Sequence, residues 1–338
     1  MSDLQNLLSS PAGLALAAIG ALTLSCYAWN FIKLVTKSFI VPGYNLKKFG
    51  AKNGRWAVVT GATDGIGREF ALQLAKAGFN VFIASRSMDK LEAVRKEIND
   101  ANSGTNVQVQ VHAIDFSRRD AQAEGEWSRL GDALKKLDIG VLVNNVGKSY
   151  DIPAYFDDVP TKDNEDIVQI NINATMRMTQ IALPAMLTKK NGLILNIGSF
   201  AGSVPGPMLA TYSASKAFLS TWSQALADEY KSRGIVVEHV HTYFVVSAMS
   251  KIRKPSLLIP TAKTYVRSVL KHIGTGAGAM PGVTATTTPY WPQAFMSWFI
   301  GYLPRWFTIR WTHNLHIDIR KRALKKRERE AALAAKTK

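Results

Sequence analysis

The chain has 338 residues, and its 42 Lys and Arg against 25 Asp and Glu leave a formal net charge of +17. That length allows one large domain or two modest ones. With 47% hydrophobic and 20% charged residues the chain is neither disordered nor fibrous, and its single cysteine, Cys26, excludes a disulfide framework and a cysteine-based zinc site. The positive charge favours anionic partners such as phosphate-bearing ligands, lipid headgroups or nucleic acid.

The first element expected is a membrane-spanning helix at residues 11–32, which contain no charged side chain. Such a helix would be about 33 Å long, against a hydrocarbon core of about 30 Å. A cleaved signal peptide and a buried core helix are the alternatives. A signal peptide usually has positive charges before its apolar region, but no Lys or Arg precedes this segment. Lysines follow from Lys33 onward, so the positive-inside rule predicts a cytosolic body. An uncleaved anchor of this kind suits the endoplasmic reticulum.

Short apolar runs then alternate with helical patterns. The pattern predicts strands at 56–60, 80–84, 107–114, 139–143, 193–198 and 235–241, with helices at 65–78, 88–99, 118–137, 163–189 and 210–233. Continuous Val- and Ile-rich strands separated by helices are typical of a parallel sheet covered on both faces, so we expect a doubly wound α/β fold of the Rossmann type. The expected organisation is an anchor and linker at 1–50, an α/β domain at 51–250 that would hold the ligand-binding motifs described below, a ligand-binding or membrane-associated extension at 251–319 and a basic tail at 320–338.

Ligands of such sheets bind at the carboxyl ends of the strands. The first strand runs into a glycine-rich turn at residues 60–67, where glycines let the backbone approach a pyrophosphate at a helix N-terminus. The second strand ends at Ser85 and Arg86, at the place where an NAD site usually carries Asp or Glu. Because a guanidinium suits a 2′-phosphate, Arg86 favours NADPH as the cofactor.

A second set of residues suits carbonyl chemistry. Tyr212 and Lys216 are four residues apart and so share one helix face. A neighbouring ammonium lowers the pKa of a phenol, which makes Tyr212 a usable proton donor to a carbonyl oxygen. Ser199 follows the fifth strand, where its hydroxyl could hydrogen-bond the same oxygen.

Taken together, these motifs resemble the short-chain dehydrogenase/reductase family over residues 54–250. Residues 60–67 match the family's Thr-Gly-x-x-x-Gly-Ile-Gly turn, and 144–147 match its Asn-Asn-Ala-Gly with Val146 in place of Ala. The resemblance implies four catalytic residues, Ser199, Tyr212, Lys216 and Asn171. It also implies a cofactor-binding set of Gly61, Thr63, Asp64, Gly65, Ile66, Gly67, Arg86, Asp115, Asn144, Tyr212, Lys216, Val245 and Ser247.

The family's mechanism, carried onto these positions, assigns each catalytic residue a role. Tyr212 would protonate the forming alkoxide while Ser199 holds the oxygen. Lys216 would lower the pKa of Tyr212 and grip the nicotinamide ribose. Asn171 would hold a water that links Lys216 to solvent.

The chain departs from the family after the sixth strand. Most members have Pro-Gly there, whereas residues 242–249 read Thr-Tyr-Phe-Val-Val-Ser-Ala-Met. With the anchor, this departure makes the chain resemble a microsomal branch whose fungal members reduce 3-oxoacyl-CoA in fatty-acid elongation. The branch is shared with certain 17β-hydroxysteroid dehydrogenases. It implies NADPH-dependent reduction of very-long-chain 3-oxoacyl-CoA to 3-hydroxyacyl-CoA, the second step of elongation.

Other readings stay open at this point. Within enzymes the alternative is a steroid or other lipid ketone reductase, and outside them it is a catalytically idle membrane scaffold. The expected partners are a long-chain 3-oxoacyl-CoA and a lipid membrane, with other elongation enzymes left open. No nucleic acid is expected, because the basic tail has no interleaved aromatic residue for stacking. No metal is expected either, since His239 and His241 lack a third ligand.

The region after residue 250 is less regular. We expect a helix at 261–273 and a loop or short strand at 274–288. Aromatic residues gather at 290–311, which fits a short membrane segment, an interfacial element or the wall of an acyl-chain tunnel, with a soluble core helix as the plain alternative. The tail is expected to be a solvated helix near an anionic membrane surface.

Overall fold

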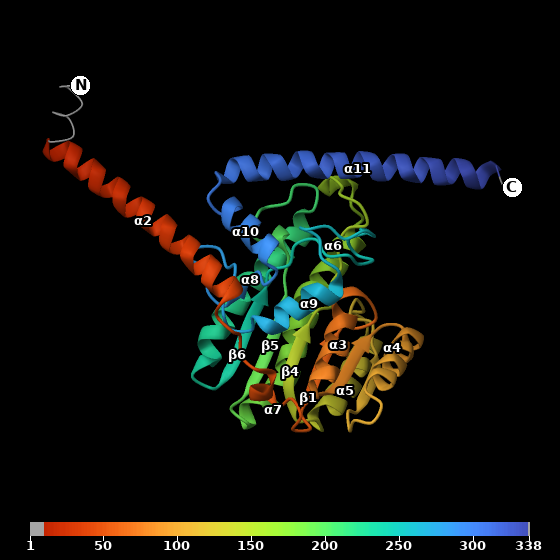
Figure 1. Cartoon of the computed structure of the whole chain (residues 1–338). Coiled ribbons are helices and arrows are strands. Elements are labelled where there is room, and N and C mark those ends of the chain that lie inside the picture. Colours follow the sequence, from red (N-terminus) through yellow and green to blue (C-terminus); the bar gives the residue numbers. More distant parts are fainter. Residues whose placement is uncertain (1–9, 337–338) are drawn as a thin grey trace.

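A seven-stranded parallel sheet forms the centre of the molecule, whose residues 10–336 are described by a computed structural model (Figure 1). The strand order is β3-β2-β1-β4-β5-β6-β7, and every neighbouring pair is parallel. The strands are β1 (Trp56–Thr60), β2 (Asn80–Ser85), β3 (Val109–Ala113), β4 (Ile139–Asn144), β5 (Gly192–Ile197), β6 (Ile235–Val240) and β7 (Thr286–Thr287). This confirms the predicted fold class and the six predicted strands, and the edge strand β7 lies within 274–288, where a loop or short strand is expected.

Helices cover both faces of the sheet. Val58 and Val59 of β1 belong to different hydrophobic clusters, because successive side chains of a strand point to opposite faces. The Val59 cluster packs under α3 (Gly65–Ala77), α4 (Met88–Ala101) and α9 (Ala262–Lys271). The Val58 cluster packs under α5 (Ala121–Lys135), α7 (Ala174–Thr188) and α8 (Ala210–Lys231). Both faces are therefore apolar, which explains the continuous hydrophobic runs of the strands.

The long helix expected at 163–189 is interrupted. The structure divides it into α6 (Thr161–Val168), a π-helical turn (Gln169–Asn173) and α7. A π-turn inserts an extra residue into a helix and often occurs at functional sites. Here it contains Asn171, whose side chain is fully buried beneath the carboxyl edge of the sheet.

The chain order of the strands reverses between β1 and β4, so connections leave this point in opposite directions. Ligands of open α/β sheets bind at such a reversal, outside the carboxyl ends of the strands. The short 3-10 helix Phe200–Gly202 lies at this end of the sheet, directly after β5.

The two ends of the chain extend beyond the sheet domain. α2 (Pro11–Phe39) projects away from it as an apolar helix, whereas α11 (Arg305–Lys336) lies across the top of the view and is joined to the body through α10 (Trp291–Ile300) (Figure 1). α2 is the one candidate membrane span within residues 10–336, and it fits a membrane anchor. α11 continues without a break through residue 320, where the expected basic tail begins. The expected boundary at residue 320 is therefore a change in charge and does not coincide with an end of a helix. Residues 337–338 of the expected tail lie outside the described part.

Candidate active site

Tyr212 and Lys216 lie on the first turns of α8, at the carboxyl edge of the sheet. The Lys216 Nζ atom is 5.9 Å from the centre of the Tyr212 ring, and it donates a hydrogen bond of 2.8 Å to the carbonyl oxygen of Ile197 in β5. Ser199 follows β5, and its side chain lies close enough to the Tyr212 hydroxyl to lower the pKa of Tyr212. The structure thus brings the three residues together as the sequence predicted.

A glycine allows this close arrangement. Gly202 lies in the short 3-10 helix that Ser199 caps by accepting a hydrogen bond of 3.2 Å from the backbone of Ala201. A Cβ atom at Gly202 would come within 2.6 Å of the backbone of Lys216. Since real Cβ atoms do not approach backbone that closely, only glycine lets the Ser199 turn pack directly on α8.

Burial shifts the pKa values of Tyr212 and Lys216 in opposite directions, because it disfavours the charged form of each group. It raises the pKa of Tyr212, against a smaller opposing effect of the hydrogen bond with Ser199. It lowers the pKa of Lys216 to about 8. Tyr212 therefore keeps its proton at neutral pH. The shift is opposite to the lowering by Lys216 that the sequence predicted, because burial of the hydroxyl has the larger effect.

Asn171 is held by two neighbours. Its Oδ1 atom accepts a hydrogen bond of 2.8 Å from the backbone of Lys148, and its Nδ2 atom donates to the Lys148 carbonyl at 3.0 Å and to the Ser215 hydroxyl at 2.9 Å. A Cβ atom built at Gly147 would lie 3.5 Å from Asn171 Oδ1 and 3.7 Å from Lys216 Nζ. Asn171 and Lys216 therefore approach the same spot, while the Asn171 amide joins the loop after β4 to α8.

Sequence reasoning missed Lys148. Besides its backbone contacts with Asn171, its ammonium donates hydrogen bonds of 2.7 Å to Asp163 and 2.9 Å to Asp166, both on α6. Asp166 is buried and also accepts from Lys162. Burial raises the pKa of Asp166, but the hydrogen bonds from Lys148 and Lys162 outweigh it and lower that pKa overall. Such a contact spans loop and helix, so no local motif marks it.

Replacing Asp166 by Asn is expected to lower the free energy of unfolding by about 2 kcal/mol, because charge-assisted hydrogen bonds to a buried carboxylate are lost. Urea unfolding of the detergent-solubilised protein measures it. Asp163→Asn is the matched control, since Asp163 is half exposed and bonds only Lys148. An effect of Asp163→Asn as large as that of Asp166→Asn would contradict the importance of the buried carboxylate.

The glycine-rich turn after β1 has the conformation that a nucleotide site needs. Gly61 and Gly65 have φ values of +64° and +54°, which favour glycine. Asn145 holds this turn, because its Nδ2 atom donates to the carbonyl oxygens of Thr60 and Gly61 at 3.0 and 3.1 Å. The expected cofactor residues of this region are distributed as follows: Thr63 and Asp64 lie in the turn, and Gly65, Ile66 and Gly67 begin α3.

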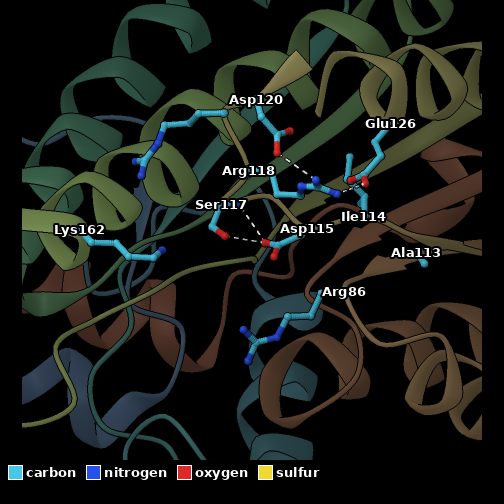
Figure 2. Close-up of a pocket in the computed structure, with 10 residues that line it drawn as sticks. Arg86, Ala113, Ile114, Asp115, Ser117, Arg118, Asp120, Glu126 and Lys162 are labelled. Carbon is cyan, nitrogen blue, oxygen red and sulfur yellow. Dashed lines mark hydrogen bonds and ion pairs between the residues drawn. The ribbon is translucent and has the colours of Figure 1, made fainter. Parts of the chain in front are cut away.

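A cavity of about 660 Å³ lies at the ends of β2 and β3, where Arg86 and Asp115 both line it (Figure 2). Asp115 accepts hydrogen bonds from the backbone and the hydroxyl of Ser117, at 2.9 and 2.7 Å. The structure thus places Arg86 and Asp115 at one site, beyond the glycine-rich turn.

The cations around this cavity differ in their pairing. Arg118 pairs with Asp120 and Glu126, and Arg119 and Lys162 both pair with acidic residues of α6, as Figure 2 shows for Arg118. Among the Arg and Lys residues that line this cavity, Arg86 is the one that makes no ion pair within residues 10–336. Its exposed guanidinium therefore remains free for an anionic ligand.

The loop after β6 turns without the Pro-Gly of most family members. The Ser250 hydroxyl donates to the carbonyl of Val245 at 2.7 Å, and Ser247 donates to the same oxygen at 3.3 Å. A Cβ atom at Gly65 would lie 3.1 Å from Ser247, and the Ala248 backbone donates to Asp64 at 3.4 Å. Serine hydrogen bonds thus replace Pro-Gly and hold Val245 and Ser247 over the glycine-rich turn.

The side chain of Asn144, which the resemblance assigns to the cofactor, points into the interior of the domain. It is buried, and its Nδ2 atom donates to Asn196 at 2.8 Å and to Thr179 at 3.0 Å. The side chain therefore supports the interior between β4, β5 and α7. The next residue, Asn145, contacts the glycine-rich turn because side chains of a strand alternate between faces.

His239 lies in β6, and His241 directly follows this strand. His239 and His241 are both buried, and no group of three His, Cys, Asp or Glu that could hold a metal ion occurs within residues 10–336. Burial lowers the pKa of His239 to about 3 and that of His241 to about 4, so both rings are neutral at physiological pH.

Comparisons with known proteins match this geometry. A family model described as short chain dehydrogenase matches residues 55–256. The chain is 54% identical over 320 residues to a protein of Coprinopsis cinerea named very-long-chain 3-oxoacyl-CoA reductase, covering 94% of this chain and 92% of the relative. It is 51% identical to the protein of that name from Laccaria bicolor, over 94% of this chain and 93% of the relative.

Solved structures share the fold. A short-chain dehydrogenase from Sphingobium yanoikuyae in complex with NADPH is 25% identical, with a TM-score of 0.57 over 64% of this chain and 82% of that chain. A metagenomic short-chain oxidoreductase in complex with NADP is 28% identical, with a TM-score of 0.53 over 64% and 88%. A 7beta-hydroxysteroid dehydrogenase covers 80% of this chain and 99% of its own with a TM-score of 0.65, but at 20% identity it shows the fold alone.

Proposed function

The chain belongs to the short-chain dehydrogenase family and is an oxidoreductase with a nicotinamide cofactor, and from this premise we propose that it reduces very-long-chain 3-oxoacyl-CoA to 3-hydroxyacyl-CoA with NADPH. The observation that carries the proposal is the meeting of Ser199, Tyr212 and Lys216 at the end of β5. This arrangement suits protonation of a carbonyl oxygen. Relatives above 50% identity that bear the name of this reductase support the substrate.

The residues present fit NADPH. A glycine-rich turn with positive φ values precedes α3, and the unpaired guanidinium of Arg86 lines a cavity beyond it. Arg86 would bind the 2′-phosphate, and Asp115 would contact the adenine. Val245 and Ser247 would lie near the nicotinamide amide. When bound, this cofactor supplies a hydride to the ketone carbon.

Tyr212 and Ser199 would act on the oxygen of the ketone. Ser199 donates a hydrogen bond that holds this oxygen beside Tyr212, and Tyr212 donates its proton as negative charge develops there. The effect of the Ser199 side chain on the pKa of Tyr212 supports a shared contact of both hydroxyls with this oxygen. The raised pKa of Tyr212 keeps the proton in place until the oxygen becomes basic.

Lys216 and Asn171 would support Tyr212 from behind. The Lys216 ammonium is held by Ile197. Its charge would make loss of the Tyr212 proton easier during the reaction, and it would also bind the nicotinamide ribose. Asn171 positions the loop after β4 against α8 through Lys148 and Ser215. The link through water from Asn171 to solvent remains part of the proposal.

The pH dependence of the reaction tests the role of Lys216. Because its pKa is lowered to about 8, the ammonium loses its proton as the pH rises through that value. We expect kcat/KM for reduction to fall above about 8, measured by NADPH consumption on both sides of this pH. Lys216→Arg, which keeps its charge at higher pH, should move the fall upward. A profile that stays flat through this range would contradict the role.

We also place the enzyme in the endoplasmic reticulum membrane, with α2 as anchor and the catalytic domain in the cytosol. The lysines that follow the apolar part of α2 support this orientation. A basic surface suits the phosphates of CoA, and enzymes of the same elongation cycle are candidate partners on the same membrane.

The decisive assay follows NADPH absorbance with detergent-solubilised protein and three mixtures: a very-long-chain 3-oxoacyl-CoA, a steroid ketone, and no substrate. Consumption with the acyl-CoA is the expected result. Consumption only with the steroid would replace the proposal by the steroid reductase alternative. Silence with both substrates despite tight NADPH binding would favour an idle scaffold.

A further inference from the structure

α10 lies along the end of α2 that joins the catalytic domain. The ring of Phe39 is 6.0 Å from Trp291, and the ring of Phe31 is 5.4 Å from Trp298. Farther along α2, the Tyr27 ring is 4.7 Å from Tyr302. Residues later in the sequence of α10 and its following turn thus contact residues earlier in the sequence of α2. The two helices therefore run antiparallel.

The contacts between α10 and α2 indicate how deeply α10 would lie in the proposed membrane. Lys33 is the first charged residue after the apolar part of α2 and would lie at the headgroup level. Tyr27 precedes it by six residues, or about 9 Å along a helix axis. Since Tyr302 contacts Tyr27, the turn after α10 would reach this depth in the lipid. Interfacial helices bury their apolar faces to about 5–10 Å.

A polar contact fixes the same register. Asn30 lies within the apolar part of α2, where an unpaired amide is costly in lipid. Its Nδ2 atom donates to the Tyr302 hydroxyl at 3.3 Å. The hydrogen bond satisfies part of the Asn30 amide exactly where α10 ends, so the packing of α10 on α2 has polar as well as aromatic support.

The outer surface of α10 and of the first turns of α11 carries exposed aromatic residues, with Arg305 and Arg310 exposed beside them. Phe299 is 60% exposed and Trp306 is 72% exposed, and Phe307 and Trp311 follow on α11 with nearly half of each side chain exposed. Exposed aromatic groups of this size mark contact with another phase or partner. Basic residues then follow along the exposed side of α11, namely Lys321, Arg322, Lys325 and Arg329. Aromatic residues followed by cations suit the boundary of an anionic bilayer.

α11 also reaches the loops that flank the catalytic residues. The ring nitrogen of His316 lies 2.6 Å from the carbonyl oxygen of Pro207, a few residues before Tyr212. Arg320 donates to the carbonyl of Pro153 at 2.9 Å and pairs with Asp158. One helix therefore connects the aromatic surface to the loops on either side of the site, consistent with its course across the molecule in Figure 1.

α10 makes a second connection to the site. The Nε2 atom of Gln293 donates to the carbonyl oxygens of Phe244 and Leu258, each at 2.9 Å. Phe244 and Leu258 belong to the segment after β6, and both expose much of their side chains. Apolar surface thus continues from α10 to the loop that holds Val245.

We propose that α10 and the first turns of α11, residues 291–311, form a hairpin that sits shallowly in the lipid surface beside α2 and faces the active-site loops toward that surface. The proposal rests on the membrane anchoring proposed above for α2. The loops that flank Tyr212 would then lie next to acyl chains dissolved in the bilayer.

Site-specific fluorescence tests the insertion in the full chain. In a Cys26→Ser background, a single cysteine replaces Phe299 or Trp306 and carries an environment-sensitive dye, with the protein in vesicles that contain anionic phospholipid. We expect a blue shift and strong quenching by lipids that carry a nitroxide near the headgroup. Asp132→Cys, at an exposed position on α5, is the control. Quenching at 299 and 306 no greater than at 132 would overturn the proposal.

An activity experiment tests the consequence. The double variant Phe299→Asp with Trp306→Asp should reduce a short, water-soluble 3-oxoacyl-CoA at the rate of the unchanged protein. With a very-long-chain substrate in vesicles its rate should fall about tenfold, because charges at the interface weaken insertion. Equal rates with the vesicle substrate, or equal losses with both substrates, would contradict the proposal. If the protein without these substitutions reduced neither substrate, the proposed function would be refuted. The quenching experiment would still test whether residues 291–311 insert into the lipid surface.

Discussion

Replacing Tyr212 by Phe is expected to lower kcat by about a thousandfold, because the substitution removes the group proposed to protonate the substrate oxygen. The Kd for NADPH should stay within a few-fold of the original value. Phe keeps the ring that packs between Ser199 and Lys216, so the site should keep its shape. Stopped assays with a very-long-chain 3-oxoacyl-CoA measure kcat, and NADPH fluorescence measures the Kd.

The control for this change is Tyr230→Phe, at the far end of the same helix. It removes the same atom from α8 and should leave kcat unchanged. Loss of NADPH binding in Tyr212→Phe would show that Tyr212 serves mainly the cofactor. Nearly full activity in Tyr212→Phe would show that another group donates the proton.

Exchanging Arg86 for Asp should raise the Kd for NADPH about a hundredfold, since a charge-assisted hydrogen bond is replaced by repulsion of the 2′-phosphate. The Kd for NADH should change little, because NADH has a hydroxyl at this position. Titration of the purified protein with each cofactor gives both values. The expected result is therefore a reversal of cofactor preference and not a general loss of binding.

Lys90→Asp is the matched control, because it makes the same change of charge nearby on α4 but does not line the cavity. It should leave both Kd values near their original level. Equal weakening of NADPH and NADH by Arg86→Asp would refute the assignment of Arg86 to the 2′-phosphate.

Much of the fold and of the site could be predicted from the sequence because the signals are local. β1, β2, β4 and β5 are short, mostly apolar runs bounded by turns, and their buried faces require such composition. Tyr212 and Lys216 share a helix face by spacing alone. The charge-free residues 11–32 are long enough to span a membrane by composition, and α2 has that composition in the structure.

Other features depend on contacts between distant parts of the chain, and only the tertiary structure decides them. The π-turn around Asn171 interrupts a pattern that reads as one helix, and the contacts of Asn171 with Lys148 and Ser215 hold it in place. Asn144 and Asn145 are identical residues side by side, yet the alternation of the strand sends one to the interior and the other to the glycine-rich turn.

The carboxy-terminal aromatic residues show the same division. Their number and type in 290–311 are plain in the sequence, where several structures remain compatible with them. Pairing with Phe31, Phe39 and Tyr27 in α2 places them beside the proposed membrane span, and His316 of α11 meets the loop before Tyr212. Periodicity and composition determine which segments form and what each can bury, but contacts between segments far apart in the chain determine which surface each one meets.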